Sequence, residues 1–201
     1  MRYGIHPHTV FASVNKIADL KIRAFAWKYF QGALNFNHKA TCDCGRATNT
    51  HQHIFFECEL TQFLRDQADR FADLIYTHKP VKYSIPWNET FFWSEWGTYD
   101  PRPPLIRCIM ICALQAMWSS IGTRFRVPIT KNLQNMANAQ LMLARNIRKD
   151  SEREKRVCQV ERQWKFDKLW LTQSGFPTLK LFTIKSIEGT SKLSNTKLPL
   201  I

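Results

Sequence analysis

The stretch that decides the fold is CDCGRATNTHQHIFFEC, residues 42–58. It places Cys42, Cys44, His53 and Cys58 close together in the chain. Three thiolates and one imidazole form a tetrahedral zinc set that leaves no position open for water or a substrate. A closed set of this kind stabilises a fold and does not activate water. The spacing therefore predicts a structural Zn²⁺ ion with these four ligands, rather than a metalloenzyme centre.

The local spacing limits how the four ligands can meet. Gly45 follows Cys44 and permits a sharp turn that aims backbone N–H groups at the sulfurs. His53 and Cys58 are residues i and i+5, and on one ideal α-helix they would diverge by about 140°. At least one of them must therefore lie in a turn, with Cys58 just ahead of a helix. His51 competes with His53 for the fourth position, and the alternatives to a metal site are unmetallated cysteines or a redox pair.

Apolar residues at helical spacing on both sides of this stretch predict a mainly α-helical protein. We expect helices over about 10–18 (with Thr9 as N-cap), 22–34, 60–76, 105–125 and 129–171, the last interrupted once. The 105–125 helix is apolar nearly all round, which predicts that it is buried. In the 60–76 helix we expect the charged residues Arg65, Asp66, Asp69, Arg70 and Asp73 on the solvated face.

The chain divides into four parts by composition. We expect a zinc-binding helical module over residues 9–78, an irregular loop over 79–104, a basic helical extension over 105–171 and a weakly ordered tail over 172–201. The loop holds Pro80, Pro86, Pro101 and Pro103 together with many aromatic residues, so we expect it to lack regular structure and to cover a core. The tail is expected to form at most one short strand, near 179–184.

The charge of the chain favours polyanionic partners. Its 29 Lys and Arg residues outnumber its 16 Asp and Glu residues, for a formal net charge of +13. We therefore predict RNA or DNA binding without sequence specificity. The candidate contacts are Arg23, Lys28, Lys39 and Arg46 near the metal ligands, and Arg148, Lys149, Arg153, Lys155 and Arg156 in a distal patch. Trp27 or Phe36 could stack on a base, although the apolar neighbours of Trp27 favour a place in the core.

Other functional classes lack their motifs. The chain has no Tyr-x-Asp-Asp polymerase motif, no acidic set of the RNase H kind, no Gly-rich phosphate loop and no Gly-x-Ser-x-Gly. We therefore expect no enzyme. The clustered and helical cysteines fit free thiols in a reducing compartment, which predicts an intracellular protein of the nucleus or cytoplasm. The longest uncharged apolar stretch, 108–123, is short for a membrane span, so we expect no membrane contact.

At residues 15–78 the chain resembles the reverse-transcriptase zinc-binding domain of LINE-type (non-LTR) retrotransposons. The resemblance rests on an aromatic helix with Trp27, Cys42-x-Cys44, Thr50-x-x-His53, four residues, Cys58 and an amphipathic helix. It selects His53 over His51 as the ligand. Asn49 and Glu59 depart from the family's usual Glu and frequent Pro, and the first departure puts a turn hydrogen bond in doubt, not the metal.

The resemblance implies a C-terminal fragment of a retroelement, and residues 105–171 resemble the region that follows this module in fungal elements. It further implies that the fragment positions a nucleic-acid template and contacts other retroelement domains. The alternative is a purely structural, zinc-stabilised protein-interaction module or a non-functional remnant of a mobile element. Binding to RNA or single-stranded DNA that weakens with salt would separate the two hypotheses.

Overall fold

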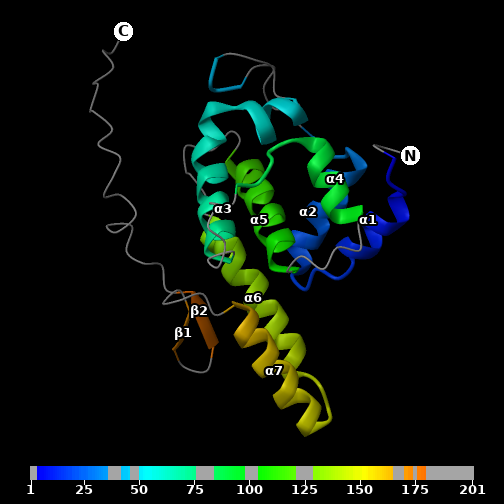
Figure 1. Cartoon of the computed structure of the whole chain (residues 1–201), viewed down its shortest axis with the longest axis vertical. Coiled ribbons are helices and arrows are strands. Elements are labelled where there is room, and N and C mark those ends of the chain that lie inside the picture. Colours follow the sequence, from blue (N-terminus) through cyan, green and yellow to red (C-terminus); the bar gives the residue numbers. More distant parts are fainter. Residues whose placement is uncertain are drawn as a thin grey trace, which may run out of the picture.

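The computed structural model describes residues 4–35, 42–45, 50–75, 84–97, 104–120, 129–164, 170–173 and 176–179. These residues form a mainly α-helical protein, as predicted (Figure 1). The helices are α1 (Pro7–Val14), α2 (Leu20–Gln31), α3 (Gln62–Ile75), α4 (Glu89–Gly97), α5 (Pro104–Ser120), α6 (Ile129–Arg145) and α7 (Asp150–Trp164). A π-helical turn, η1 (His53–Glu57), and a 3₁₀ turn, η2 (Glu59–Thr61), precede α3, and two short strands, β1 (Trp170–Gln173) and β2 (Phe176–Leu179), follow α7.

Helix α5 is the centre of the core. It packs against α2, α3, α4, α6 and η1, and in Figure 1 it lies between α3 on one side and α2 and α4 on the other. Its residues 109–114 are buried without interruption, so no side of this part of the helix faces water. The prediction of a buried helix is therefore confirmed. None of the described helices is long and apolar enough to cross a membrane.

The first two helices begin at caps that the sequence reading missed. The prediction of Thr9 as the N-cap of the first helix was wrong, because α1 begins at Pro7 and His6 Nδ1 accepts from the backbone N–H of His8 at 3.2 Å. Proline has no backbone N–H, and the N–H at the first helical position would have no partner within the helix. Proline is therefore favoured there, which explains why α1 begins at Pro7. Asp19 caps α2 by accepting from the N–H of Ile22 at 2.8 Å.

The segment predicted to be irregular contains a helix. Helix α4 covers residues 89–97, and Asn88 Oδ1 caps it by accepting from the N–H of Phe91 at 2.8 Å. The prolines that motivated the prediction all lie outside these residues, so they do not interrupt the helix. The prediction that the aromatic residues cover a core is confirmed, since Trp93 and Trp96 are buried with their rings 5.2 and 5.6 Å from that of Phe30. Residues 79–83 and 98–103 lie outside the described residues.

The carboxylate of Asp69 ties α3 to the chain that leads into α4. Its Oδ1 accepts from the backbone N–H of Ile85 at 2.9 Å and from the indole N–H of Trp87 at 3.1 Å. Its Oδ2 accepts from the hydroxyl of Ser84 at 3.0 Å. Asp69 was predicted to be solvated, but it is half-buried because residues 84–87 place three donors around its carboxylate.

Helices α6 and α7 lie side by side and extend away from the rest of the molecule (Figure 1). The predicted interruption is confirmed, and it falls between Arg145 and Asp150. The indole N–H of Trp164 donates to Gln140 Oε1 at 2.7 Å and joins the two helices. The described part of α7 ends at Trp164, and residues 170–173 are in β1, so the prediction of a helix to about 171 was wrong. Strand β1 pairs with β2 in antiparallel orientation, and only Leu179 of the strand predicted near 179–184 lies within the described residues. Residues 180–201 lie outside the described residues.

Candidate metal centre

Two turns carry the four predicted ligands. Cys42 and Cys44 lie on a tight turn in which the N–H of Gly45 donates to Cys42 O at 2.9 Å. Gly45 has φ 74°, a left-handed conformation that glycine adopts without steric strain, so the predicted turn at Gly45 is confirmed. His53 begins η1, where its backbone N–H donates to Thr50 Oγ1 at 3.1 Å.

The π-helical turn brings the second pair of ligands together. The N–H of Cys58 donates to His53 O at 2.7 Å, an i to i+5 bond. This wider winding places residues five apart one above the other, whereas an α-helix would separate them by about 140°. Cys58 leaves the turn in an extended conformation, with φ −65° and ψ 127°, just ahead of η2 and α3. Both the turn and the position ahead of a helix agree with the prediction from the spacing.

The four ligand atoms lie close enough to share one ion. Cys42 Sγ is 3.5 Å from Cys58 Sγ, Cys44 Sγ is 3.2 Å from His53 Nε2, and all four atoms lie within 4.8 Å of one another. For zinc bonds of about 2.3 Å to sulfur and about 2.05 Å to nitrogen, a regular tetrahedron has edges of about 3.8 Å between sulfurs and about 3.6 Å from sulfur to nitrogen. The cluster could therefore hold a metal ion such as zinc.

His51 does not belong to this cluster. Its ring centroid lies 4.6 Å from that of Tyr29 and 5.0 Å from that of Phe55, and its Nδ1 is 4.0 Å from Glu89 Oε1. The side chain thus packs among aromatic rings on the core side of η1. Of the two histidines, it is His53 that belongs to the cluster, with its Nε2 at 3.2 Å from Cys44 Sγ.

The surroundings of Cys42 favour its protonated form when no cation is bound. Burial raises the pKa of Cys42 to about 12; the backbone N–H of Cys44 opposes this rise, and the thiols of Cys58 and Cys44 add to it. A metal ion reverses this balance, because a coordinated thiol loses its proton. The site therefore suits a cation far better than it suits isolated thiolates.

Arg65 is a buried partner of the site that the sequence reading placed wrongly in solvent. Only 3% of the residue is exposed. Its Nη2 donates to Cys58 O at 2.7 Å, and its Nη1 donates to Thr61 Oγ1 at 2.9 Å and to Phe55 O at 3.5 Å. Burial lowers the pKa of Arg65, and the charge of Cys58 is the largest of the influences that raise it. Helical spacing from the buried Thr61 to Ala68 and Ala72 was the signal that could have revealed it.

The predicted nucleic-acid contacts divide into two kinds. Arg23 and Arg153 serve the fold: Arg23 Nε donates to Ile17 O at 2.7 Å, and Arg153 pairs with Asp150 and donates to Ile147 O at 3.5 Å. The side chains of Lys28, Arg148, Lys149, Lys155 and Arg156 are exposed. Lys39 and Arg46 lie outside the described residues.

Of the two predicted stacking residues, the structure describes Trp27. One face of its ring stacks on Phe11, with centroids 4.3 Å apart, and its indole N–H donates to Asn15 Oδ1 at 3.0 Å. This packing joins α1 to α2, so Trp27 contributes to the fold, as the apolar neighbours in its helix indicated. Phe36 lies outside the described residues.

Comparison of the chain with models of known families, with curated proteins and with solved structures found no match in any of the three. What stands on the geometry alone is a helical protein in which Cys42, Cys44, His53 and Cys58 form a cluster able to hold a metal ion.

Proposed function

We propose that this chain is a zinc-binding module in which one Zn²⁺ ion has a structural role. The observation that supports this most is the convergence of three sulfurs and one imidazole nitrogen within 4.8 Å. Thiolate and imidazole ligands together select zinc or another soft cation over magnesium or calcium. Because all four tetrahedral positions are taken by side chains, the ion has no place for a catalytic water, and we infer that the module is not an enzyme.

The ion would hold together parts of the chain that are separate in sequence. The turn of Cys42 and Cys44 would be tied to η1, and through Cys58 to the start of α3. The residues between the ligands in η1, Ile54, Phe55 and Phe56, are buried, and η1 packs on α5. Ligand binding energy is therefore folding energy for this side of the core.

The resemblance to the reverse-transcriptase zinc-binding domain remains part of the proposal. It is supported by the order of the ligands between α2 and α3, and by the turn in which Thr50 accepts from the N–H of His53. On this proposal the chain works inside the cell, in the nucleus or cytoplasm, next to other retroelement domains.

Native mass spectrometry and metal analysis of the purified chain test the zinc assignment. We expect one zinc per chain, and loss of that zinc in Cys42→Ser or Cys58→Ser. Cys158→Ser is the matched control, since Cys158 is an exposed thiol on α7 outside the cluster. A wild-type chain that emerges without metal from zinc-supplemented growth, or that loses zinc equally in all three variants, would contradict the proposal.

A second candidate function is RNA or DNA binding. It is favoured by the formal net charge of +13 and by the exposed side chains of Lys28, Arg148, Lys149, Lys155 and Arg156. Binding through phosphates weakens with salt, because each contact releases counterions. No binding to mixed-sequence RNA or single-stranded DNA at about 50 mM salt would leave the purely structural module as the function.

A further inference from the structure

The four ligand atoms of the metal centre fall into two close pairs. Cys44 Sγ lies 3.2 Å from His53 Nε2, and Cys42 Sγ lies 3.5 Å from Cys58 Sγ. A disulfide has a sulfur–sulfur bond of about 2.05 Å, so the sulfurs of Cys42 and Cys58 need to approach by only about 1.5 Å to form one. These two residues are 16 positions apart, so the bond would join the same parts of the chain that the ion joins.

The backbone on both sides of this sulfur pair is held by bonds that do not involve the ion. The N–H of Cys58 donates to His53 O at 2.7 Å, and Cys58 O accepts from Arg65 Nη2 at 2.7 Å. The turn of Cys42 has its own bond, from the N–H of Gly45 to Cys42 O at 2.9 Å. The two sulfurs are therefore kept within reach of each other while the coordination of the ion changes, and such proximity favours a reaction between them.

The two sulfurs differ in their access to solvent. Cys42 is partly exposed, whereas only 1% of Cys58 is exposed. A soluble oxidant therefore reaches Cys42 first, and Cys58 is the neighbour that can react with the oxidised sulfur. Thiols that sense oxidants have this arrangement, in which an accessible sulfur lies next to a second, resolving cysteine. A coordinated thiol is also deprotonated, as the reacting form must be.

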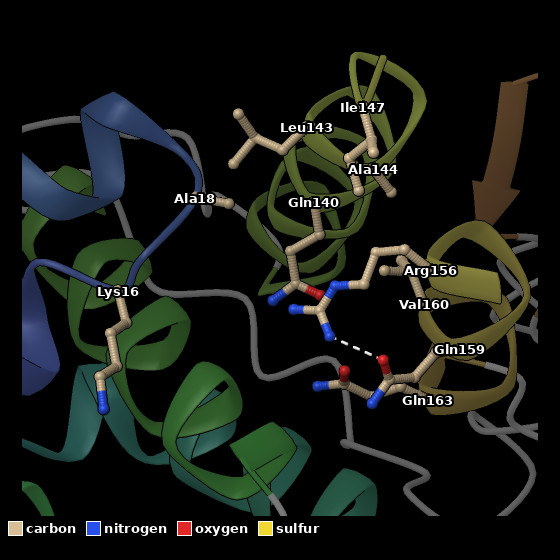
Figure 2. Close-up of a pocket in the computed structure, with 10 residues that line it drawn as sticks. All are labelled: Lys16, Ala18, Gln140, Leu143, Ala144, Ile147, Arg156, Gln159, Val160 and Gln163. Atoms are coloured by element: carbon tan, nitrogen blue, oxygen red, sulfur yellow. Dashed lines mark hydrogen bonds between the residues drawn. The ribbon is translucent and has the colours of Figure 1, made fainter. Parts of the chain in front are cut away.

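The three cysteines outside the cluster lack this arrangement. On α5, burial raises the pKa of Cys108 to about 12 and that of Cys112 well above its usual value, so both thiols stay protonated and unreactive. Cys158 is exposed on α7, and the neighbouring α6 contains no cysteine. Helix α7 faces α6 and the turn between α1 and α2 across a cleft of about 350 Å³, and none of the described residues that line this cleft is a cysteine (Figure 2). Oxidation of Cys158 therefore finds no resolving thiol there.

We propose that the metal centre is also an oxidation site, at which a hydroperoxide converts Cys42 and Cys58 to a disulfide. This proposal rests on the proposed zinc-binding function. The disulfide replaces the ion as the link between the turn of Cys42 and the start of α3. In a reducing compartment the disulfide is transient, because thiol reductants break it again.

The reaction consumes one hydroperoxide for each disulfide. The thiolate sulfur of Cys42 attacks one oxygen of hydrogen peroxide, the O–O bond breaks, and Cys42 becomes a sulfenic acid while the other oxygen leaves as hydroxide. The thiolate of Cys58 then attacks the sulfur of Cys42, so that an S–S bond forms, the S–O bond breaks and a second hydroxide leaves. Two protons from solvent convert both hydroxides to water. The two sulfurs thus lose two electrons and the peroxide gains them.

The disulfide leaves half of the ligand set. A sulfur in a disulfide is no longer an anionic ligand, so only Cys44 and His53 remain for the ion. Structural zinc sites use four ligands, so we expect zinc to be released when the disulfide forms.

Peptide mapping of the full, zinc-loaded chain tests the pairing. Trypsin cuts after lysine and arginine, so Cys42 and Cys44 fall in the peptide 40–46. Cys58 falls in the peptide 47–65. After one equivalent of hydrogen peroxide and alkylation of the remaining thiols, we expect these two peptides to be linked, with the alkyl group on Cys44.

Zinc release is counted in the same samples with a chromophoric chelator. We expect one zinc ion to be released for each linked pair of peptides, and dithiothreitol with added zinc to restore the loaded chain. Cys158→Ser is the background for every measurement, since this exposed thiol outside the cluster could join two chains. Cys42→Ser in that background is expected to lose the link.

Circular dichroism tests whether the disulfide replaces the ion in the fold. Oxidised and reduced chains are compared, both in the presence of a strong chelator. We expect the oxidised chain to keep more helical signal and to melt at a higher temperature, because the bond still ties the turn of Cys42 to the start of α3. Identical spectra and melting curves would show that the disulfide does not replace the ion.

The failure of the disulfide and the failure of the zinc function give different results. A wild-type chain that purifies without zinc refutes the zinc function and this proposal with it. A zinc-loaded chain in which the bridge forms within the peptide 40–46, or in which Cys42 stops at a sulfinic acid, keeps the zinc function and refutes the disulfide.

Discussion

Replacing Arg65 with methionine is expected to destabilise the zinc-loaded protein by about 2–5 kcal/mol, from the loss of hydrogen bonds to buried acceptors together with weaker zinc binding. Methionine has a similar length and fills the same space, so the change removes charge and donors rather than volume. The carbonyl oxygen of Phe55 loses its Arg65 donor, whereas that of Cys58 keeps the N–H and the hydroxyl of Thr61 as donors. Each buried acceptor left without a partner costs about 1–3 kcal/mol.

The charge of the metal cluster contributes a second part. Zn²⁺ with three thiolates and a neutral imidazole carries a net charge of −1, and the guanidinium of Arg65 is bonded to the backbone of one of those ligands. Loss of an outer-shell partner weakens metal binding about 10–100-fold, which corresponds to about 1.4–2.7 kcal/mol. We therefore expect part of the destabilisation to depend on zinc.

Urea unfolding measures the free energy of unfolding of the wild-type and variant chains. Comparing samples with zinc and with a chelator separates the zinc-dependent part of the destabilisation from the rest. Competition with a chromophoric chelator measures zinc affinity. Arg65→Lys retains the charge without the planar fork, so it should recover zinc affinity more than it recovers stability. Arg70→Met, on the exposed side of α3, is the control and should change stability by less than about 0.5 kcal/mol. An Arg65→Met protein that unfolds at the wild-type urea concentration and holds zinc equally well would refute this reasoning.

Four further predictions concern the metal site and the packing of α3. Removal of zinc by a strong chelator is expected to lower the helical signal in circular dichroism through loss of η1 and α3, while the paired helices α6 and α7 keep theirs; an unchanged spectrum and melting curve would contradict it. Burial raises the pKa of Cys42 from 9.0 to about 12 in the metal-free chain, so zinc must displace the proton of this thiol. Zinc affinity should therefore rise about tenfold per pH unit for each proton released. Calorimetry in buffers of different ionisation enthalpy should count those protons. By the same shift, the metal-free fold should lose stability as the pH rises from 9.0 toward 12, since the unfolded chain releases the proton first. Asp69→Ala should cost about 2–4 kcal/mol in urea unfolding, because the N–H groups of Ile85 and Trp87 lose a charged acceptor. Asp66→Ala, at an exposed position of the same helix, is its control.

The parts of the molecule that the sequence predicted well are those set by residue type and period. Helix α5 follows from an uninterrupted apolar run, and the cluster of Cys42, Cys44, His53 and Cys58 follows from the ligand preferences of zinc. Gly45 predicted a turn because few residues other than glycine adopt a left-handed conformation without strain. Each of these signals is local, so it can be read without knowledge of the neighbours in space.

The parts that escaped prediction depend on contacts between distant residues. Arg65 is charged, yet it is buried because the carbonyl oxygens of Phe55 and Cys58 accept hydrogen bonds from it. A π-helical turn positions these carbonyls, and the spacing of apolar residues does not reveal such a turn. Asp69 is half-buried because its carboxylate accepts from the indole N–H of Trp87, a residue far from it in the sequence. Helix α4 was missed because the prolines around it outweighed the cap at Asn88, although those prolines stand outside the helix.

The π-helical turn places a metal ligand and three core side chains in immediate succession, His53 and then Ile54, Phe55 and Phe56. In a newly synthesised chain without a bound ion, these apolar side chains would be exposed to chaperones and proteases. On the proposal of a structural zinc ion, the availability of metal at the moment of synthesis would then decide how many copies persist, and cellular abundance would follow the zinc supply.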